Sequence, residues 1–235
     1  MDIIIILFII SIIMCVSWLA CKDRILGSEN QTYKRNQTLD EYLKTQGQTA
    51  FEGHSTQLTD EPEFLKNIVK NNNIKHVMEI GFNAGHSSDI FLSNNKNIHV
   101  TSFDIGEHAY VQHSKKYIDT TYPGRHELII GDSTKTIPNY IKNNKHKKFD
   151  IIFIDGGHDY NIAKADLMNC RHLAKSSKSI VIMDDTTFPN NKECEWNVGP
   201  NRAWKEAKDA GIVKELGSSN EQPCRGYSYG KYSNI

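Results

Sequence analysis

Short apolar runs alternate with helix-length stretches along most of the chain. The runs occupy His76–Ile80, Ile98–Ile105, Glu127–Ile130, Phe149–Ile154 and Ser179–Met183. They are apolar throughout rather than at every second position, which is typical of strands buried on both faces of a parallel sheet. Helix-length stretches follow each of the first four runs. The alternation therefore predicts a doubly wound, Rossmann-like α/β domain.

Both ends of this domain contain further elements. Thr59 or Asp60 can cap a helix that precedes the first strand. Near the C-terminus, a helix around Asn201–Ala210 is followed by apolar runs at Ile212–Leu216 and Gly226–Tyr232. These two runs are close together in the sequence, so we expect an antiparallel pair at the edge of the sheet. The prediction is a mostly parallel, seven-stranded sheet with an antiparallel last strand.

An uncharged segment precedes the domain. The nineteen residues Ile3–Cys21 carry no charge and are dominated by Ile, Leu, Met and Val. At a rise of about 1.5 Å per residue, a helix of this length nearly spans a hydrocarbon core of about 30 Å. We predict a transmembrane anchor at residues 1–21, a polar stalk at residues 22–58 and the α/β domain at residues 59–235.

The sequence leaves the topology of this anchor open. A cleaved signal peptide is the alternative, but no basic residue precedes the segment, and Trp18 stands where cleavage favours a small residue. Lys22 and Arg24 follow the segment, and the positive-inside rule places them in the cytosol. In contrast, glycosylation sequons at Asn30 and Asn36 fit a lumenal stalk. The anchor is predicted to be uncleaved, with the side of the domain undetermined.

The composition argues against one class of partner. Lys and Arg together number 28, as do Asp and Glu, so the formal net charge is zero. Nucleic-acid-binding domains usually carry a basic excess or a basic stripe, so nucleic acid is not an expected partner. The cysteines add little, because a pairing of Cys194 with Cys224 in a lumenal domain cannot be read from the sequence.

The first predicted strand runs into a glycine-containing turn, Glu79-Ile-Gly81-Phe-Asn83-Ala-Gly85. Glycines let the backbone turn sharply from strand to helix and approach a ligand closely. Ligands of open parallel sheets bind beyond the carboxyl ends of the strands, where this turn lies. Asp104 ends the second strand 23 residues after Gly81. An acid at about this distance accepts hydrogen bonds from ribose hydroxyls in nucleotide-binding α/β folds.

Polar residues also follow the third predicted strand. Asp132 and Ser133 come directly after Gly131 and would face the same cleft, where they could contact an adenine. Asp132 can equally be the N-cap of a helix that starts near Thr134. Both interpretations stay open.

Carboxylates gather after the fourth and fifth predicted strands. Asp155 ends the fourth strand, and Asp184 and Asp185 end the fifth. In adjacent parallel strands these three residues converge at one edge of the sheet, where their charges repel unless a cation neutralises them. A hard ion of the Mg²⁺ type accepts such an all-oxygen set. His158 follows Asp155 by three residues and lies within plausible reach of a hydroxyl held there.

These residues resemble class I S-adenosylmethionine-dependent methyltransferases, particularly the metal-dependent O-methyltransferases of the catechol and macrolide-sugar kinds. The resemblance covers about residues 53–235. It implies that Asp155, Asp184 and Asp185 bind Mg²⁺ or another divalent cation, and that His158 is the general base of a catalytic pair with Asp155. It also implies a cofactor site made by Glu79, Gly81, Asn83, Gly85, Asp104, Asp132 and Ser133.

Departures from the catechol type indicate the acceptor. Catechol-type members carry Asn as the third ligand and Lys as the base, whereas this chain has Asp185 and His158. The latter set looks more like that of the sugar-modifying members, which favours a sugar hydroxyl of a small molecule or glycan. Arg202 and Trp204 are candidates for the acceptor site, although a tryptophan in an amphipathic helix more often belongs to the core. Residues 53–57 are a candidate lid.

Three other functions are weaker interpretations. A metal-independent N- or O-methyltransferase would share the cofactor turn. An NAD-dependent oxidoreductase would also use an acid after a glycine turn, but the middle glycine of G-x-G-x-x-G is missing and hydride transfer needs no carboxylate trio. A membrane-tethered binding module without activity would not need the full acid and histidine set. The sequence leaves the acceptor, the ion and the oligomeric state open.

Overall fold

The computed structural model describes residues 37–51, 60–71, 73–188, 194–219 and 225–233. The predicted anchor and the first part of the predicted stalk lie outside the described residues, as does the candidate lid at 53–57. Among the residues that are described, no helix combines the length and the apolar composition needed to cross a bilayer. The anchor therefore stays a prediction.

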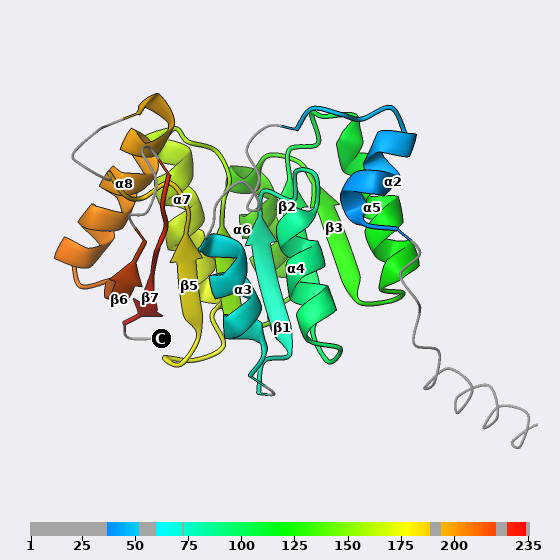
Figure 1. Cartoon of the computed structure of the whole chain (residues 1–235). Helices are drawn as coiled ribbons and strands as arrows, with labels where there is room; N and C mark the ends of the chain where they lie inside the picture. Colours follow the sequence, from blue (N-terminus) through cyan, green and yellow to red (C-terminus); the bar gives the residue numbers. More distant parts are fainter. Residues whose placement is uncertain (1–36, 52–59, 72, 189–193, 220–224, 234–235) are drawn as a thin grey trace, which may run out of the picture. The chain divides into compact units, whose positions relative to one another are not determined.

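The strands form one seven-stranded sheet in the order β3-β2-β1-β4-β5-β7-β6 (Figure 1). β1 to β5 are parallel to one another, and β7 runs antiparallel to both β5 and β6. This arrangement confirms the predicted mostly parallel sheet with an antiparallel last strand. The strands are β1 (His76–Ile80), β2 (His99–Asp104), β3 (His126–Ile130), β4 (Ile151–Ile154), β5 (Ile180–Met183), β6 (Val213–Ser218) and β7 (Ser228–Tyr232).

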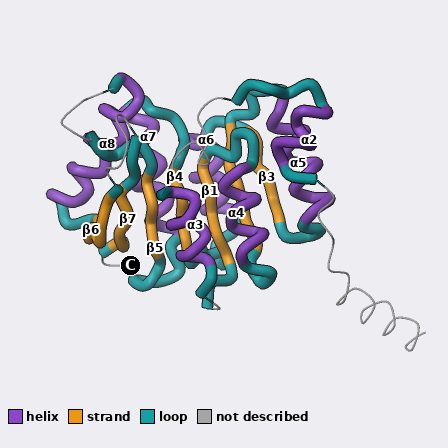
Figure 2. Tube along the Cα trace, viewed as in Figure 1, coloured by secondary structure: helices purple, strands orange, loops and turns teal. Residues whose placement is uncertain are grey.

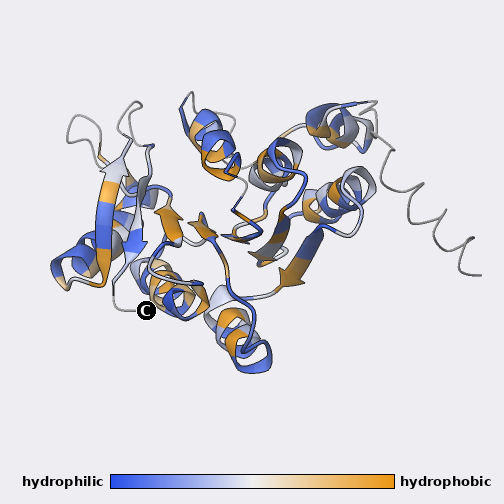
Figure 3. Cartoon of the chain, turned by 90° about the horizontal axis from the view of Figure 1, so that it is seen from below, coloured by the Kyte–Doolittle hydropathy of each residue, from blue (hydrophilic) through white to orange (hydrophobic). Residues whose placement is uncertain are grey.

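Helices cover both faces of the sheet, as the view from below shows (Figure 3). Successive strand residues alternate between two apolar clusters: Val77 and Phe153 join the helices on one face, whereas Met78 and Ile152 join those on the other. The fold is therefore doubly wound, as predicted (Figure 2). The first face carries α2 (Leu39–Thr45), α3 (Glu61–Val69), α4 (His86–Asn94) and α5 (Tyr110–Thr121); the second carries α6 (Ser133–Asn143), α7 (Tyr160–Cys170) with the 3₁₀ turn η2 (Arg171–Leu173), and α8 (Glu195–Asp209).

The middle of the predicted stalk differs from the expectation of an irregular linker. Residues Leu39–Thr45 form α2, which begins with a capping box between Thr38 and Glu41. Leu39 and Leu43 are buried in the same apolar cluster as α4 and α5. This helix was not predicted because only two of its residues, Leu39 and Leu43, are apolar and buried, which is too few to form a sustained pattern.

The last helix also starts earlier than its predicted position near Asn201. α8 begins at Glu195 because Cys194 and Asn197 cap each other at its N-terminus. Cys194 is disulfide-bonded, and Cys224, its expected partner, lies outside the described residues. Gly199 brings this first part of the helix against the loop after β4, since a Cβ at Gly199 would stand 2.1 Å from the carbonyl oxygen of His158.

The strand register aligns the tips of four strands. Ile80 pairs with Phe103 of β2 and with Ile154 of β4, and Ile154 pairs with Met183 of β5. The residue that follows each of these four positions is therefore at the same level of the sheet. Those residues are Gly81, Asp104, Asp155 and Asp184.

Candidate active site

A cleft of about 770 Å³ opens at these strand tips. It contains the ends of β1 and β4, where the strand order changes direction and where open α/β sheets bind their ligands. Its volume falls in the range of about 300 to 1,000 Å³ that is usual for small-molecule sites. The predicted site residues that line it are Gly81, Asn83, Asp104, Asp132, Ser133, Asp155, His158, Asp184 and Asp185.

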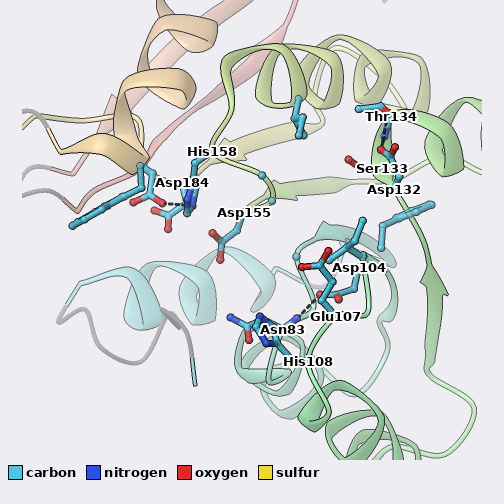
Figure 4. A pocket seen from close by; sticks show the side chains of 18 of the residues that line it. Asn83, Asp104, Glu107, His108, Asp132, Ser133, Thr134, Asp155, His158 and Asp184 are labelled. Carbon is cyan, nitrogen blue, oxygen red and sulfur yellow. Dashed lines mark hydrogen bonds and ion pairs between the residues drawn. The ribbon is translucent and has the colours of Figure 1, made fainter. Parts of the chain in front are cut away.

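The turn after β1 approaches β4 so closely that only glycine fits at position 81. Gly81 has a φ of +90°, and a Cβ placed on it would stand 1.8 Å from the carbonyl oxygen of Asp155. Asn83 also has a positive φ of 48°, and its N–H donates to the Asp104 carboxylate over 2.7 Å. This hydrogen bond connects Asp104, at the end of β2, to the loop between β1 and α4 (Figure 4).

Replacement of Gly81 by alanine is expected to unfold this corner. The clash and the positive φ together predict a loss of about 2 to 5 kcal/mol in the free energy of unfolding, measured by urea denaturation, with loss of S-adenosylhomocysteine binding. Gly124 is the matched control, because it has a φ of +74° but no atom within 4 Å of its added Cβ. Gly124→Ala should cost only about 1 kcal/mol. Equal losses for both variants would contradict the close-approach argument.

The acids of the predicted cofactor side are held by backbone groups. Asp104 also accepts from the N–H of Gly106 over 2.7 Å. Asp132 is the N-cap of α6 and accepts from the N–H of Thr134 over 2.9 Å. The hydroxyl of Thr134 and the ammonium of Lys135 lower the pKa of Asp132 to about 2. Asp132 is thus a helix N-cap that also lines the cleft, and its contact with an adenine stays a prediction.

Two residues of the predicted cofactor turn do not line the cleft. Glu79 is fully buried below the turn, where the Ser88 and Ser102 hydroxyls each donate to its carboxylate over 2.6 Å and Ser87 also donates. Burial raises the pKa of Glu79 to about 7, although the serine hydrogen bonds oppose this shift. Gly85 is the N-cap of α4 with a φ of +82°. Neither residue is among those that line the cleft, so their roles as direct cofactor ligands stay predictions.

The three predicted metal-site carboxylates come together at the tips of β4 and β5. Ligand atoms of Asp155, Asp184 and Asp185 all lie within 4.8 Å of one another. Burial and the neighbouring carboxylates raise the pKa of Asp155 well above its usual range and that of Asp184 to about 7. Asp184 Oδ1 is buried and has no hydrogen-bond partner in the described part of the chain. Asp185 adopts a φ of +54°, a conformation that Asp tolerates better than most residues.

His158 faces this carboxylate trio. Its Nε2 lies 3.0 Å from Asp185 Oδ2, and the imidazole is about half-exposed. The hydrogen bond that His158 donates to Asp185 raises the pKa of His158 above its usual value, although burial opposes the shift. In Figure 4, Asp155 lies between the His158–Asp184 side of the cleft and the Asn83–Asp104 side. The site therefore joins an acid-and-base centre to the cofactor turn.

The predicted acceptor residues lie elsewhere. Trp204 is 3% exposed, belongs to the apolar core and donates to Glu215 over 2.6 Å. Arg202 stacks over the Tyr160 ring and pairs with Glu206, and it is not among the residues that line the cleft. The assignment of Trp204 to the acceptor site is corrected, because Trp204 lies on the face of α8 that packs on the sheet.

Other residues contribute to the cleft that the sequence analysis did not identify. Trp196, 41% exposed, reaches it from the first turn of α8, and Arg225 reaches it from the segment before β7. Glu61, the first residue of α3, also lines it. None of them belongs to a spacing motif. The only sequence signal for Glu61 is that it is an acidic residue at the start of a predicted helix.

The comparisons with known proteins agree with this fold and cleft. The family described as a methyltransferase domain matches residues 78–186. An O-methyltransferase from Bacillus cereus in complex with S-adenosylhomocysteine (SAH) has a TM-score of 0.64 at 18% identity, covering 90% of this chain and 97% of that chain. TomG from Streptomyces achromogenes, an O-methyltransferase in complex with S-adenosylmethionine (SAM), has a TM-score of 0.65 at 13% identity over 89% and 95%.

A third similar structure carries a sugar substrate in its name. CalS11, a TDP-rhamnose 3′-O-methyltransferase of calicheamicin biosynthesis, has a TM-score of 0.57 at 21% identity, covering 77% of this chain and 82% of that chain. No curated protein sequence matches the chain. The match to a methyltransferase domain at residues 78–186 supports a SAM-dependent methyltransferase, and the sheet order and the cleft at the strand tips agree with it.

Proposed function

We propose that this methyltransferase transfers the methyl group of SAM to a hydroxyl, assisted by a divalent cation such as Mg²⁺, and that a sugar hydroxyl is the favoured acceptor. One observation carries the proposal. Asp155, Asp184 and Asp185 converge within 4.8 Å beside the cofactor turn, and His158 is 3.0 Å from one of them. Metal-independent methyl transfer would gain nothing from three mutually repelling carboxylates.

The residues present fit a hard cation. The donor set is all oxygen, which Mg²⁺ prefers, and the buried oxygen of Asp184 lacks a partner in the described residues. The raised pKa values of Asp155 and Asp184 indicate that these carboxylates are destabilised without positive charge nearby. A bound divalent cation would supply Lewis acidity that lowers the pKa of an acceptor hydroxyl.

The chain itself supplies the base and the alignment. His158 receives the proton of the acceptor hydroxyl at Nδ1, because Nε2 carries the hydrogen that is donated to Asp185. The oxygen then forms a bond to the methyl carbon as the carbon–sulfur bond breaks. Gly81 and Asp104 position the donor side, and the fixed strand register positions the acceptor side relative to it. Alignment of this kind contributes a large part of methyl-transfer rates.

An exposed aromatic side chain in the cleft supports a sugar acceptor. Trp196 lines the same cleft as the three carboxylates and exposes 41% of its surface. An exposed indole face suits packing against a sugar ring. The combination of Asp185 and His158 at the metal side supports the same acceptor class, through the resemblance described above.

An acceptor screen at saturating Mg²⁺ tests this proposal. With radiolabelled methyl donor, we expect sugars and glycosides to be methylated in preference to catechols. Trp196→Ala should raise the KM of the best sugar acceptor about tenfold, the loss of about one stacking contact, with little change in SAH binding. Preferential methylation of catechol or of an amine would contradict the assignment of a sugar hydroxyl.

A further inference from the structure

Glu61 is a buried carboxylate that the proposed mechanism does not use. It is the first residue of α3, ahead of the matched methyltransferase domain at 78–186. Its side chain is 0% exposed, yet it lines the cleft. Within the described residues, no group donates a hydrogen bond to either of its oxygens. A buried carboxylate without a partner is strongly unfavourable, so a partner is expected to come from outside the described residues.

The surroundings of Glu61 define what that partner must be. Glu61 lines the cleft together with Asp155, Asp184 and Asp185, and besides burial, their charges and that of Asp60 raise its pKa. All four neighbours are acceptors, so none can satisfy Glu61 when ionised. The missing partner is therefore a cation or a hydrogen-bond donor.

The burial of Glu61 limits how it can act on that partner. Because the side chain has no surface open to water, neither an acceptor molecule nor a water reaches its oxygens in this conformation, so Glu61 acts on a bound cation through its charge. Glu61 is also not one of the three residues whose ligand atoms lie within 4.8 Å of one another. We therefore do not count it among the direct ligands of the cation.

We propose that Glu61 is a fourth acidic residue of the cation site, which strengthens cation binding from outside the direct ligand set. The inference rests on the proposed cation-assisted function. It assigns α3 a role in the reaction centre beyond covering the sheet. Removing a residue of this kind typically weakens metal binding by about 10- to 100-fold.

Isothermal titration calorimetry of MgCl₂ into the SAH-bound protein tests the role of Glu61. For Glu61→Gln we expect the Kd for Mg²⁺ to rise about 10- to 100-fold, with the Kd for SAH unchanged. Glu63→Gln is the matched control, because Glu63 lies on the same helix but is exposed and bonded to Lys66 and Asn67. It should bind Mg²⁺ like the wild type. Glu61→Asp, which keeps the charge, should fall between these variants and serves if Glu61→Gln does not fold.

The outcomes separate this inference from the proposed function. Wild-type Mg²⁺ affinity in Glu61→Gln and Glu61→Asp would overturn the role of Glu61 alone. A raised acceptor KM at saturating Mg²⁺, with unchanged Mg²⁺ affinity, would instead assign Glu61 to the acceptor site and also overturn the inference. Failure of the wild-type protein to bind Mg²⁺ would refute the proposed function itself.

Discussion

Asp155→Asn is expected to reduce methyl transfer by at least about 10³-fold, because the cation contributes several kcal/mol to the reaction and each 1.36 kcal/mol is a factor of ten. The variant loses one of three converging carboxylates but keeps the shape of the side chain. SAH binding should stay close to that of the wild type, since Gly81 and Asp104 are unaltered. Initial rates with radiolabelled methyl donor and calorimetric SAH titrations measure the two effects.

In the absence of cations, Asp155→Asn is also expected to change how the free energy of unfolding depends on pH. A carboxyl whose pKa is raised in the folded state binds its proton more tightly there than in the unfolded chain. Stability is therefore greatest below the unfolded pKa of about 4 and falls as the pH rises towards the folded value, which is about 7 for Asp184. In EDTA, Asp155→Asn should lose less stability over this window than the wild type. Asp209→Asn, at an exposed end of α8, should behave like the wild type.

His158→Gln is expected to lower kcat by about 10²- to 10⁴-fold, the usual contribution of a general base. Glutamine can still hydrogen-bond to Asp185 but cannot accept a proton at neutral pH. Binding of Mg²⁺ and SAH should persist, because His158 is not among the converging carboxylates. A KM effect alone, with kcat intact, would show that His158 only contacts the acceptor.

The pH dependence gives His158 a second readout. A general base works when deprotonated, so wild-type kcat should rise with pH as the imidazole loses its proton. The bond to Asp185 raises the pKa of His158, so this limb should lie above the usual value of about 6.5. His158→Gln should lack the limb. His146→Gln, in the exposed loop before β4, should retain both the rate and the limb.

The fold and the strand-tip residues could be predicted because they depend on the same pattern. Buried parallel strands read as continuous apolar runs, and polar residues directly after them must lie at one edge of the sheet. Asp104, Asp155 and Asp184 are such residues. Their neighbours Asp185 and His158 follow within the same short loops. No contact information is needed to bring these side chains together.

The predicted site residues that do not line the cleft and the missed residues depend on side-chain direction or on tertiary contacts. Glu79 lies within β1 rather than beyond its tip, so its side chain points to a face of the sheet, where the serines of α4 and β2 surround it. Trp204 and Trp196 are on one helix, and only the packing of α8 decides which one reaches the cleft. Glu61 enters through the packing of α3 against the sheet, which no local pattern encodes.

The most direct test of cation-assisted methyl transfer compares one enzyme preparation with and without Mg²⁺. The protein is stripped with EDTA, dialysed, and assayed on its best hydroxyl acceptor while MgCl₂ is added back, with SAH affinity followed in parallel. We predict no measurable transfer in the stripped protein, recovery that saturates with Mg²⁺, and SAH binding throughout. Full activity in EDTA would contradict the account, because the carboxylate trio would then have no part in the reaction.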